Sequence, residues 1–264
     1  MANKYPTTPK SAAQTSGRGQ IQTRNIFVFF DLGGTLVDLR GIVASMAERL
    51  TAVRVRGPVP LALRWAVATA EALPAAQGPR FRSEREIASD VLFRLLAGRG
   101  RADAREVSTK LVQEAWAGYV GTCTLQPEVT VAWLRSLQSR VAGLGVVTDG
   151  DTEAVAGVLS HTGLKELFDS VTTSEAARSY KPDPRIYRSA LKALKARPSE
   201  SLFVSDATLD LQGAASLGIA AAWIRRSLLP DLAKPPPSTL VLSRIQDVDR
   251  IVKGYGKTGR FELR

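Results

Sequence analysis

Cysteine, histidine and long apolar runs are scarce in this sequence of 264 residues, and each scarcity excludes a class of protein or site. A single cysteine, Cys123, rules out an intrachain disulfide and a thiolate-rich metal site, which fits a reducing compartment. The one histidine, His161, falls near the end of an expected helix, where we expect a surface or capping role. The longest apolar runs are only as long as a strand, so we expect no membrane-spanning segment and no secretory signal.

Acidic residues are missing from the first 24 positions, which carry Lys4, Lys10, Arg18 and Arg24. This segment is rich in Ser, Thr, Gly and Gln, so we expect residues 1–24 to form a disordered basic tail. A transit peptide or a nucleic-acid-binding arm is the alternative, so targeting to an organelle stays open beside a cytoplasmic location. The rest of the net charge of +11 is spread as single arginines. We therefore expect a preference for anionic ligands and no dedicated binding of nucleic acid.

Short apolar runs that alternate with amphipathic helical stretches are what the sequence does contain. The first run ends on a carboxylate, and most of the others follow in the second half of the chain. Strands that alternate with helices in this way predict an α/β fold with a doubly wound, parallel, Rossmann-like sheet. The expected strands are Ile26–Phe30, Leu144–Val147, Val171–Thr173, Leu202–Ser205, Ala220–Ile224 and Thr239–Leu242.

Helical spacing alone fills the stretch between the first strand and the second. Ser83 and Glu86 predict a capping box at the start of one of its four expected helices. We therefore expect an all-helical cap domain inserted after the first strand and lying over the sheet edge. The expected boundaries are 25–40 and 122–250 for the α/β core, 41–121 for the cap and 251–264 for a C-terminal tail.

Polar side chains stand where the expected strands end. Asp31 follows the first strand and Thr148 ends the second. Lys181 lies beyond the third strand, while Asp206 and Asp210 follow the fourth. Each alone has a plain structural explanation, such as capping a turn or facing solvent. Because the carboxyl ends of parallel strands share one edge, where ligands bind, the set together predicts a site there.

These residues lie in four segments that resemble the motifs of the haloacid dehalogenase-like hydrolase superfamily, most of whose members are phosphatases. The segments are FDLGGTL from Phe30, VVTDG from Val146, SYKPDPRIY from Ser179 and FVSDATLD from Phe203. The resemblance covers about residues 26–245 and includes a helical cap inserted after the first strand. Its most specific piece is the Lys-Pro-Asp-Pro run followed by an Asp-x-x-x-Asp pair.

The resemblance implies Mg²⁺ as cofactor and a role for each motif residue. Asp31 would be the nucleophile that attacks phosphorus and forms an aspartyl-phosphate. Thr148 and Lys181 would be catalytic residues that bind the phosphoryl group, with Lys181 also balancing its charge. The other implied contacts are Gly34, Thr35 and Asp149 to phosphate or substrate, and Asp31, the Gly33 carbonyl, Asp206 and Asp210 to the metal. Asp210 would be either a ligand or the residue that holds Lys181.

Gly33 departs from the family pattern. Family phosphatases usually carry a second Asp here, which protonates the leaving alcohol and then activates water. General acid–base help of this kind is typically worth about 10²- to 10⁴-fold. Haloacid dehalogenases need no such donor, but they also lack the metal-binding acid that Asp206 provides. Phosphonoacetaldehyde hydrolases use a cap lysine instead, whereas the expected cap contains only Lys110.

The leading interpretation is a Mg²⁺-dependent phosphatase that acts on a small phosphorylated substrate through Asp31. One alternative is a weakly active or inert member that binds a partner or an anion. A further alternative is a hydrolase of the 2-haloacid dehalogenase type. The sequence leaves the substrate and the oligomeric state open.

Overall fold

The computed structural model describes residues 25–226 and 234–262, so the tail expected at residues 1–24 lies outside it. A six-stranded sheet forms the centre of the molecule, in the order β3-β2-β1-β4-β5-β6. Every neighbouring pair of strands in it is parallel. The strands are β1 (Phe27–Phe30), β2 (Gly143–Thr148), β3 (Ser170–Thr173), β4 (Ser201–Ser205), β5 (Ala220–Ile224) and β6 (Leu240–Leu242). The predicted parallel α/β sheet is confirmed.

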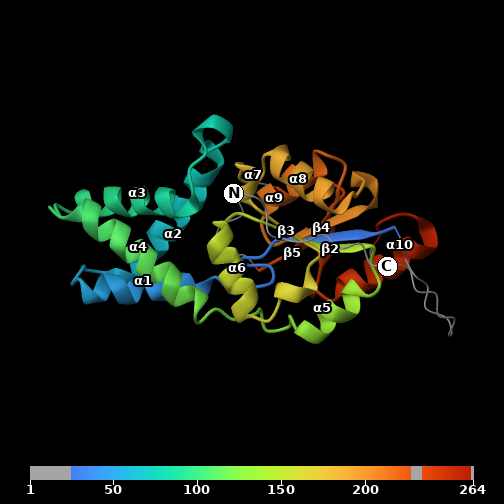
Figure 1. The fold of residues 1–264 in the computed structure, drawn as a ribbon, viewed down its shortest axis with the longest axis horizontal. Coiled ribbons are helices and arrows are strands. Elements are labelled where there is room, and N and C mark those ends of the chain that lie inside the picture. Colours follow the sequence, from blue (N-terminus) through green and yellow to red (C-terminus); the bar gives the residue numbers. More distant parts are fainter. Residues whose placement is uncertain (1–24, 227–233, 263–264) are drawn as a thin grey trace.

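Helices cover both faces of this sheet (Figure 1). One face carries α7 (Ser174–Ala177), α8 (Pro184–Leu194) and α9 (Thr208–Ala215), and the other carries α5 (Val131–Gln138), α6 (Thr152–His161) and α10 (Asp247–Thr258). Within β1, Val28 and Phe30 pack into the layer of α5, α6 and α10, whereas Phe29 packs against α8 and α9. Because both faces are buried, β1 is a continuous apolar run instead of an alternating one.

The core continues past residue 250, where we expected a C-terminal tail. Helix α10 extends to Thr258, and its residues Ile251 and Val252 are buried in the same apolar cluster as the sheet. Together with Val248 these side chains form an apolar stripe at helical spacing. The expected tail is therefore wrong for residues 251–258, which belong to the core.

Four of the five α-helices between β1 and β2 form the inserted cap, which extends from one end of the sheet (Figure 1). They are α1 (Arg40–Ala52), α2 (Pro58–Ala72), α3 (Glu84–Ala97) and α4 (Ala104–Val120). The cap has an apolar core of its own, centred on fully buried residues such as Trp65, Leu92 and Val112. The predicted capping box is present: the Ser83 side chain accepts from the Glu86 N–H, and the Glu86 carboxylate accepts from the Ser83 N–H.

The segment that leads into α3 docks the cap on the core. Gln77 exchanges two side-chain hydrogen bonds with the backbone of Tyr180, at 3.0 and 3.1 Å. Phe81 stacks on the Tyr180 ring, whose hydroxyl donates to the Arg82 carbonyl at 2.8 Å. Tyr180 directly precedes Lys181, so the cap is fastened next to the predicted site. Within residues 25–226 and 234–262, no helix is both long enough and apolar enough to cross a membrane.

Candidate active site

The central position of β1 brings three of the predicted site residues together. Asp31 directly follows β1, and its N–H donates to the Val204 carbonyl of β4 at 2.9 Å. Asp206 follows β4, and Thr148 ends β2 on the other side of β1. All three line the same cavity and are nearly inaccessible to solvent. The carboxyl edge of the sheet therefore gathers residues that are far apart in the chain.

Lys181 joins this group from the loop before α8. Its Nζ lies 2.5 Å from Asp31 Oδ1 and 2.6 Å from Asp210 Oδ2, and all three side chains are at most 10% exposed. Ser205 donates a further hydrogen bond to Asp210 at 2.9 Å. In this geometry Asp210 holds Lys181 against Asp31, which is one of the two roles predicted for it. The Asp149 carboxylate accepts from the Lys181 N–H at 2.9 Å, so it fixes the lysine loop.

Thr35 and Gly34 form the turn between the two acidic strand ends. The Thr35 hydroxyl lies 3.2 Å from Asp31 Oδ2 and 3.2 Å from Asp206 Oδ1, and it accepts from the Asp206 N–H at 3.0 Å. One hydroxyl proton serves only one of these carboxylates at a time. Gly34 has φ of +81°, and a Cβ there would lie 2.5 Å from Asp206 Oδ2. Glycine is therefore required at position 34 on both counts.

Gly33 is under a much weaker constraint than its neighbour. Its backbone lies outside the left-handed region, so no dihedral angle demands glycine. A Cβ at this position would meet only the end of the Leu39 side chain, at 3.0 and 3.3 Å from its two methyl carbons. Leu39 is 38% exposed and lines the cavity, so the end of its side chain has space to move aside. The fold therefore does not require glycine at position 33, and the absence of the family's Asp there is a difference in chemistry alone.

Burial and crowding of like charges set the ionisation of the site. Burial raises the pKa of Asp31 to about 6, against the opposing effect of the Lys181 ammonium. Burial, with the nearby charges of Asp31 and Asp210, raises the pKa of Asp206 to about 7. Burial also raises the pKa of Asp149 to about 7. Burial disfavours the charge of Lys181, but Asp210 and Asp31 outweigh it and raise the lysine pKa above its ordinary value.

The carboxylates suit a hard divalent cation. Lys181 pairs with Asp210 and with Asp31 Oδ1, which leaves Asp31 Oδ2 and the Asp206 carboxylate at the single Thr35 hydroxyl, with one ammonium for three carboxylates. Mg²⁺ is commonly held by one or two carboxylates, with waters and substrate phosphate completing its oxygen ligands. The described residues contain no cluster of three or more His, Cys, Asp or Glu side chains in metal-binding geometry. Asp31 and Asp206 are thus the two carboxylates that meet at one hydroxyl group in this cavity.

A cavity of about 750 Å³ lies over these residues, between the cap and the core. Its walls are mostly apolar, and among the residues that line it are Ile42, Leu63, Trp65, Ala66, Leu73 and Trp116 of the cap. Several polar residues there were not predicted, because none of the four motifs contains them, and three of these are Arg226, Gln126 and Glu84. Arg226 donates to the Thr35 carbonyl at 2.6 Å, and Gln126 donates to the Gly34 carbonyl at 2.9 Å. The third, Glu84, comes from the cap and enters the cavity from the start of α3.

Solved structures share this fold along almost its whole length. A defluorinating L-2-haloacid dehalogenase superposes with a TM-score of 0.71 at 24% identity, covering 90% of this chain and 100% of that one. A magnesium-bound haloacid dehalogenase-type hydrolase from Bacillus subtilis superposes with a TM-score of 0.70 at 17% identity, covering 87% and 99%. Identities this low establish the fold alone. The chain is thus an α/β protein whose parallel sheet carries an inserted helical domain over a cavity lined by buried carboxylates.

Comparison with known sequences identifies the family within this fold class. The chain belongs to the haloacid dehalogenase-like hydrolase family, whose pattern it matches over residues 27–218. A phosphoserine phosphatase from Thermus thermophilus is 31% identical over 180 residues, which are 67% of this chain and 68% of that enzyme. An (S)-2-haloacid dehalogenase from Pseudomonas sp. (strain YL) is 36% identical over 94 residues, which are 36% of this chain and 40% of that enzyme. The match to the dehalogenase thus spans well under two thirds of its length.

Proposed function

We propose that this hydrolase is a Mg²⁺-dependent phosphatase that acts on a small phosphorylated substrate through Asp31. The single observation that carries the proposal is the second buried carboxylate, Asp206, beside the nucleophile at the same Thr35 hydroxyl. A displaced halide needs no cation, and two crowded carboxylates are a burden unless a cation neutralises them. Among the enzymes that this chain resembles, haloacid dehalogenases carry no acid at the position of Asp206.

The chain's own residues supply most of the proposed mechanism. Lys181 pairs with Asp31 Oδ1 and opposes the effect of burial on the Asp31 pKa, so it favours the ionised nucleophile. Thr148, at the end of the neighbouring strand, donates a hydrogen bond to a phosphoryl oxygen. Asp31, Asp206 and the Gly33 carbonyl would hold Mg²⁺, which would supply positive charge to the phosphoryl oxygens. Water then attacks the aspartyl-phosphate and frees Asp31 for another turnover.

The cavity sets the expected body of the substrate. Its volume of about 750 Å³ leaves room for a group well beyond phosphate itself, and its cap walls are mostly apolar. Arg40 and Glu84 are charged exceptions on the cap side: both line the cavity, and Arg40 pairs with Asp38 at 2.5 Å. We therefore expect an apolar or aromatic ester group to bind better than a strongly charged one.

A 2-haloacid dehalogenase is the second candidate, and two observations favour it. Position 33 has no acid, and halide departs without a proton. The relative from Pseudomonas sp. (strain YL) is also named as a dehalogenase of this type. Against it stands Asp206, whose buried carboxylate has no evident use in displacing halide.

A substrate screen separates these functions. Phosphate esters and acyl phosphates are assayed for released phosphate with Mg²⁺ or with EDTA, and 2-haloacids for released halide. Phosphate release that depends on Mg²⁺ is the expected result. Halide release that persists in EDTA would favour the dehalogenase, and no turnover from a folded protein would favour a member that only binds a partner or an anion.

A further inference from the structure

Glu84 is a carboxyl group that the cap places in the wall of the active-site cavity. It is the first residue of α3, and it lines the cavity together with Asp31, Thr148 and Lys181. A Cβ built on Gly150 would lie 3.6 Å from its Oε2 atom. Its carboxyl group therefore rests over the loop that begins at Thr148.

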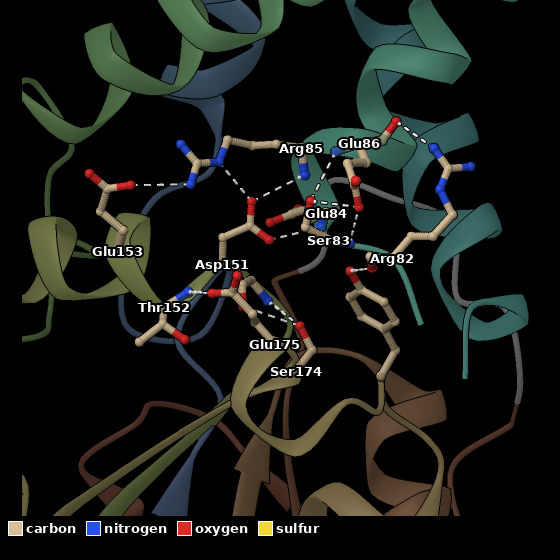
Figure 2. Close-up of polar contacts among 12 residues, drawn as sticks. Arg82, Ser83, Glu84, Arg85, Glu86, Asp151, Thr152, Glu153, Ser174 and Glu175 are labelled. Atoms are coloured by element: carbon tan, nitrogen blue, oxygen red, sulfur yellow. Dashed lines mark hydrogen bonds and ion pairs between the residues drawn. The ribbon is translucent and has the colours of Figure 1, made fainter. Parts of the chain in front are cut away.

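A buried core residue holds Glu84 in this position. The Asp151 carboxylate, only 1% exposed, accepts from the N–H groups of Glu84 and Arg85 at 2.8 and 3.2 Å and from Arg85 Nε at 2.8 Å. Figure 2 shows Asp151 directed at the start of α3, next to the capping box of Ser83 and Glu86. The first N–H groups of a helix lack partners within it, so a core carboxylate is a natural anchor for them. The contact fixes the backbone of Glu84 and leaves its side chain to face the cavity.

The carboxyl group itself is not engaged by a neighbour. Among residues 25–226 and 234–262, nothing donates a hydrogen bond to it and no ion pair includes it. The charged groups around it are Asp151 and Asp149 of the core, Arg85 of its own helix and Lys181. Burial, then the charges of Asp151 and Asp149, raise the pKa of Glu84 to about 8. The group is therefore largely protonated at neutral pH and has a proton to give.

We propose that Glu84 is the general acid and base of this enzyme, in place of the Asp that family phosphatases carry where this chain has Gly33. The proposal rests on the phosphatase function proposed above. In the first step Asp31 attacks phosphorus, the bond from phosphorus to the leaving oxygen breaks, and that oxygen takes the proton of Glu84. In the second step the Glu84 carboxylate takes a proton from water, whose oxygen attacks phosphorus as the bond to Asp31 breaks. Each turnover returns both carboxyl groups to their starting state.

The location of Glu84 makes acid catalysis depend on the docked cap. Asp31, Lys181 and Asp206 all belong to the core, whereas Glu84 comes from the cap and lines the same cavity with α3 bound to Asp151. A substrate held under the docked cap would therefore meet the nucleophile and the proton donor together. Opening of the cap would withdraw the donor and release the alcohol.

The test is a leaving-group series of aryl and alkyl phosphates, assayed with Mg²⁺ on the wild type, Glu84→Gln and Glu153→Gln. Glu153 is a matched control because it pairs with the same Arg85 but is 85% exposed. We expect Glu84→Gln to lose about 10²-fold or more in kcat on alkyl phosphates and little on p-nitrophenyl phosphate, which departs without a proton. We expect the kcat/KM of the wild type to fall as pH rises past about 8, and Glu84→Gln should lose this fall. Glu153→Gln should behave as the wild type.

Other outcomes separate this inference from the function on which it rests. A wild type that hydrolyses no phosphate ester would overturn the proposed function. An active wild type whose Glu84→Gln variant loses aryl and alkyl turnover equally, or loses neither, would overturn the role of Glu84 alone. If Glu84→Gln does not fold, Glu84→Asp keeps the acid on a shorter side chain. Glu84→Asp should turn over more slowly than the wild type, with the same leaving-group dependence and the same pH profile. A kcat/KM that does not change with pH would refute the inference.

Discussion

Placing an aspartate at position 33 should restore acid catalysis to an enzyme that lacks Glu84. The added side chain would meet only the Leu39 methyl carbons, at 3.0 and 3.3 Å from its Cβ, and Leu39 is free to move because it is 38% exposed. No backbone strain opposes the change, since Gly33 is not left-handed. We therefore expect Gly33→Asp to fold in the wild type and in Glu84→Gln.

The expected gain differs between the two backgrounds. A positioned general acid contributes about 10²- to 10⁴-fold, so Gly33→Asp should return much of that factor on alkyl phosphates to Glu84→Gln. The wild type already has a donor, and Gly33→Asp should change it by only a few fold. Gly33→Asn is the matched control, because it has nearly the same shape but no proton to give.

The assay is steady-state hydrolysis of alkyl and aryl phosphates by the four proteins and the Asn control, with folding followed by circular dichroism. Equal gains in both backgrounds would show that Glu84 does not supply the proton. No gain in either, from folded proteins that still respond to Mg²⁺, would show that position 33 does not face the leaving oxygen.

The buried charges of the site lead to four more expected outcomes. Asp31→Asn should lose all turnover and keep its unfolding temperature within a few degrees, and even a tenth of wild-type activity would exclude Asp31 as nucleophile. Asp206→Asn should lose the Mg²⁺ response in activity, while its unfolding temperature in EDTA should rise because one crowded charge is gone; a fall would contradict the crowding. The raised pKa values of Asp31, Asp206 and Glu84 mean that the folded protein keeps protons which the unfolded chain has already lost. In EDTA the unfolding temperature should therefore fall as pH rises from about 5 to about 8, and a rise would refute those shifts. Asp151→Asn should weaken cap docking and reduce alkyl more than aryl turnover, and an equal reduction would argue against its role in placing Glu84.

Much of the core was predictable because its physical rules are local. Continuous apolar runs such as Phe27–Phe30 identify strands that are buried on both faces, and parallel strands collect their end residues at one edge. Asp31, Thr148 and Asp206 can therefore be placed together from the amino-acid sequence alone. The residues around Lys181 follow the same rule, because the lysine loop comes after a neighbouring strand.

The features that escaped prediction depend on contacts between distant parts of the chain. Glu84 and Glu86 both follow Ser83, and only the docking of α3 on Asp151 sends Glu84 into the cavity. The sequence also does not show that Gly33 can be replaced whereas Gly34 cannot. They differ because a Cβ on one meets a movable leucine, and on the other the Asp206 carboxylate. The C-terminal tail was expected in error for a different reason. The apolar stripe of α10 is visible in the sequence at helical spacing, so the sequence itself predicts a helix at these residues.

Rapid-quench mass spectrometry of the peptide that contains Asp31 tests phosphatase chemistry most directly. The protein is mixed with an aryl phosphate and Mg²⁺, quenched in acid within one turnover and digested. We predict that this peptide gains the mass of one phosphoryl group, and that the gain is absent in EDTA and in Asp31→Asn. Turnover with an unmodified Asp31 peptide, or a phosphoryl group on any other residue, would contradict the mechanism.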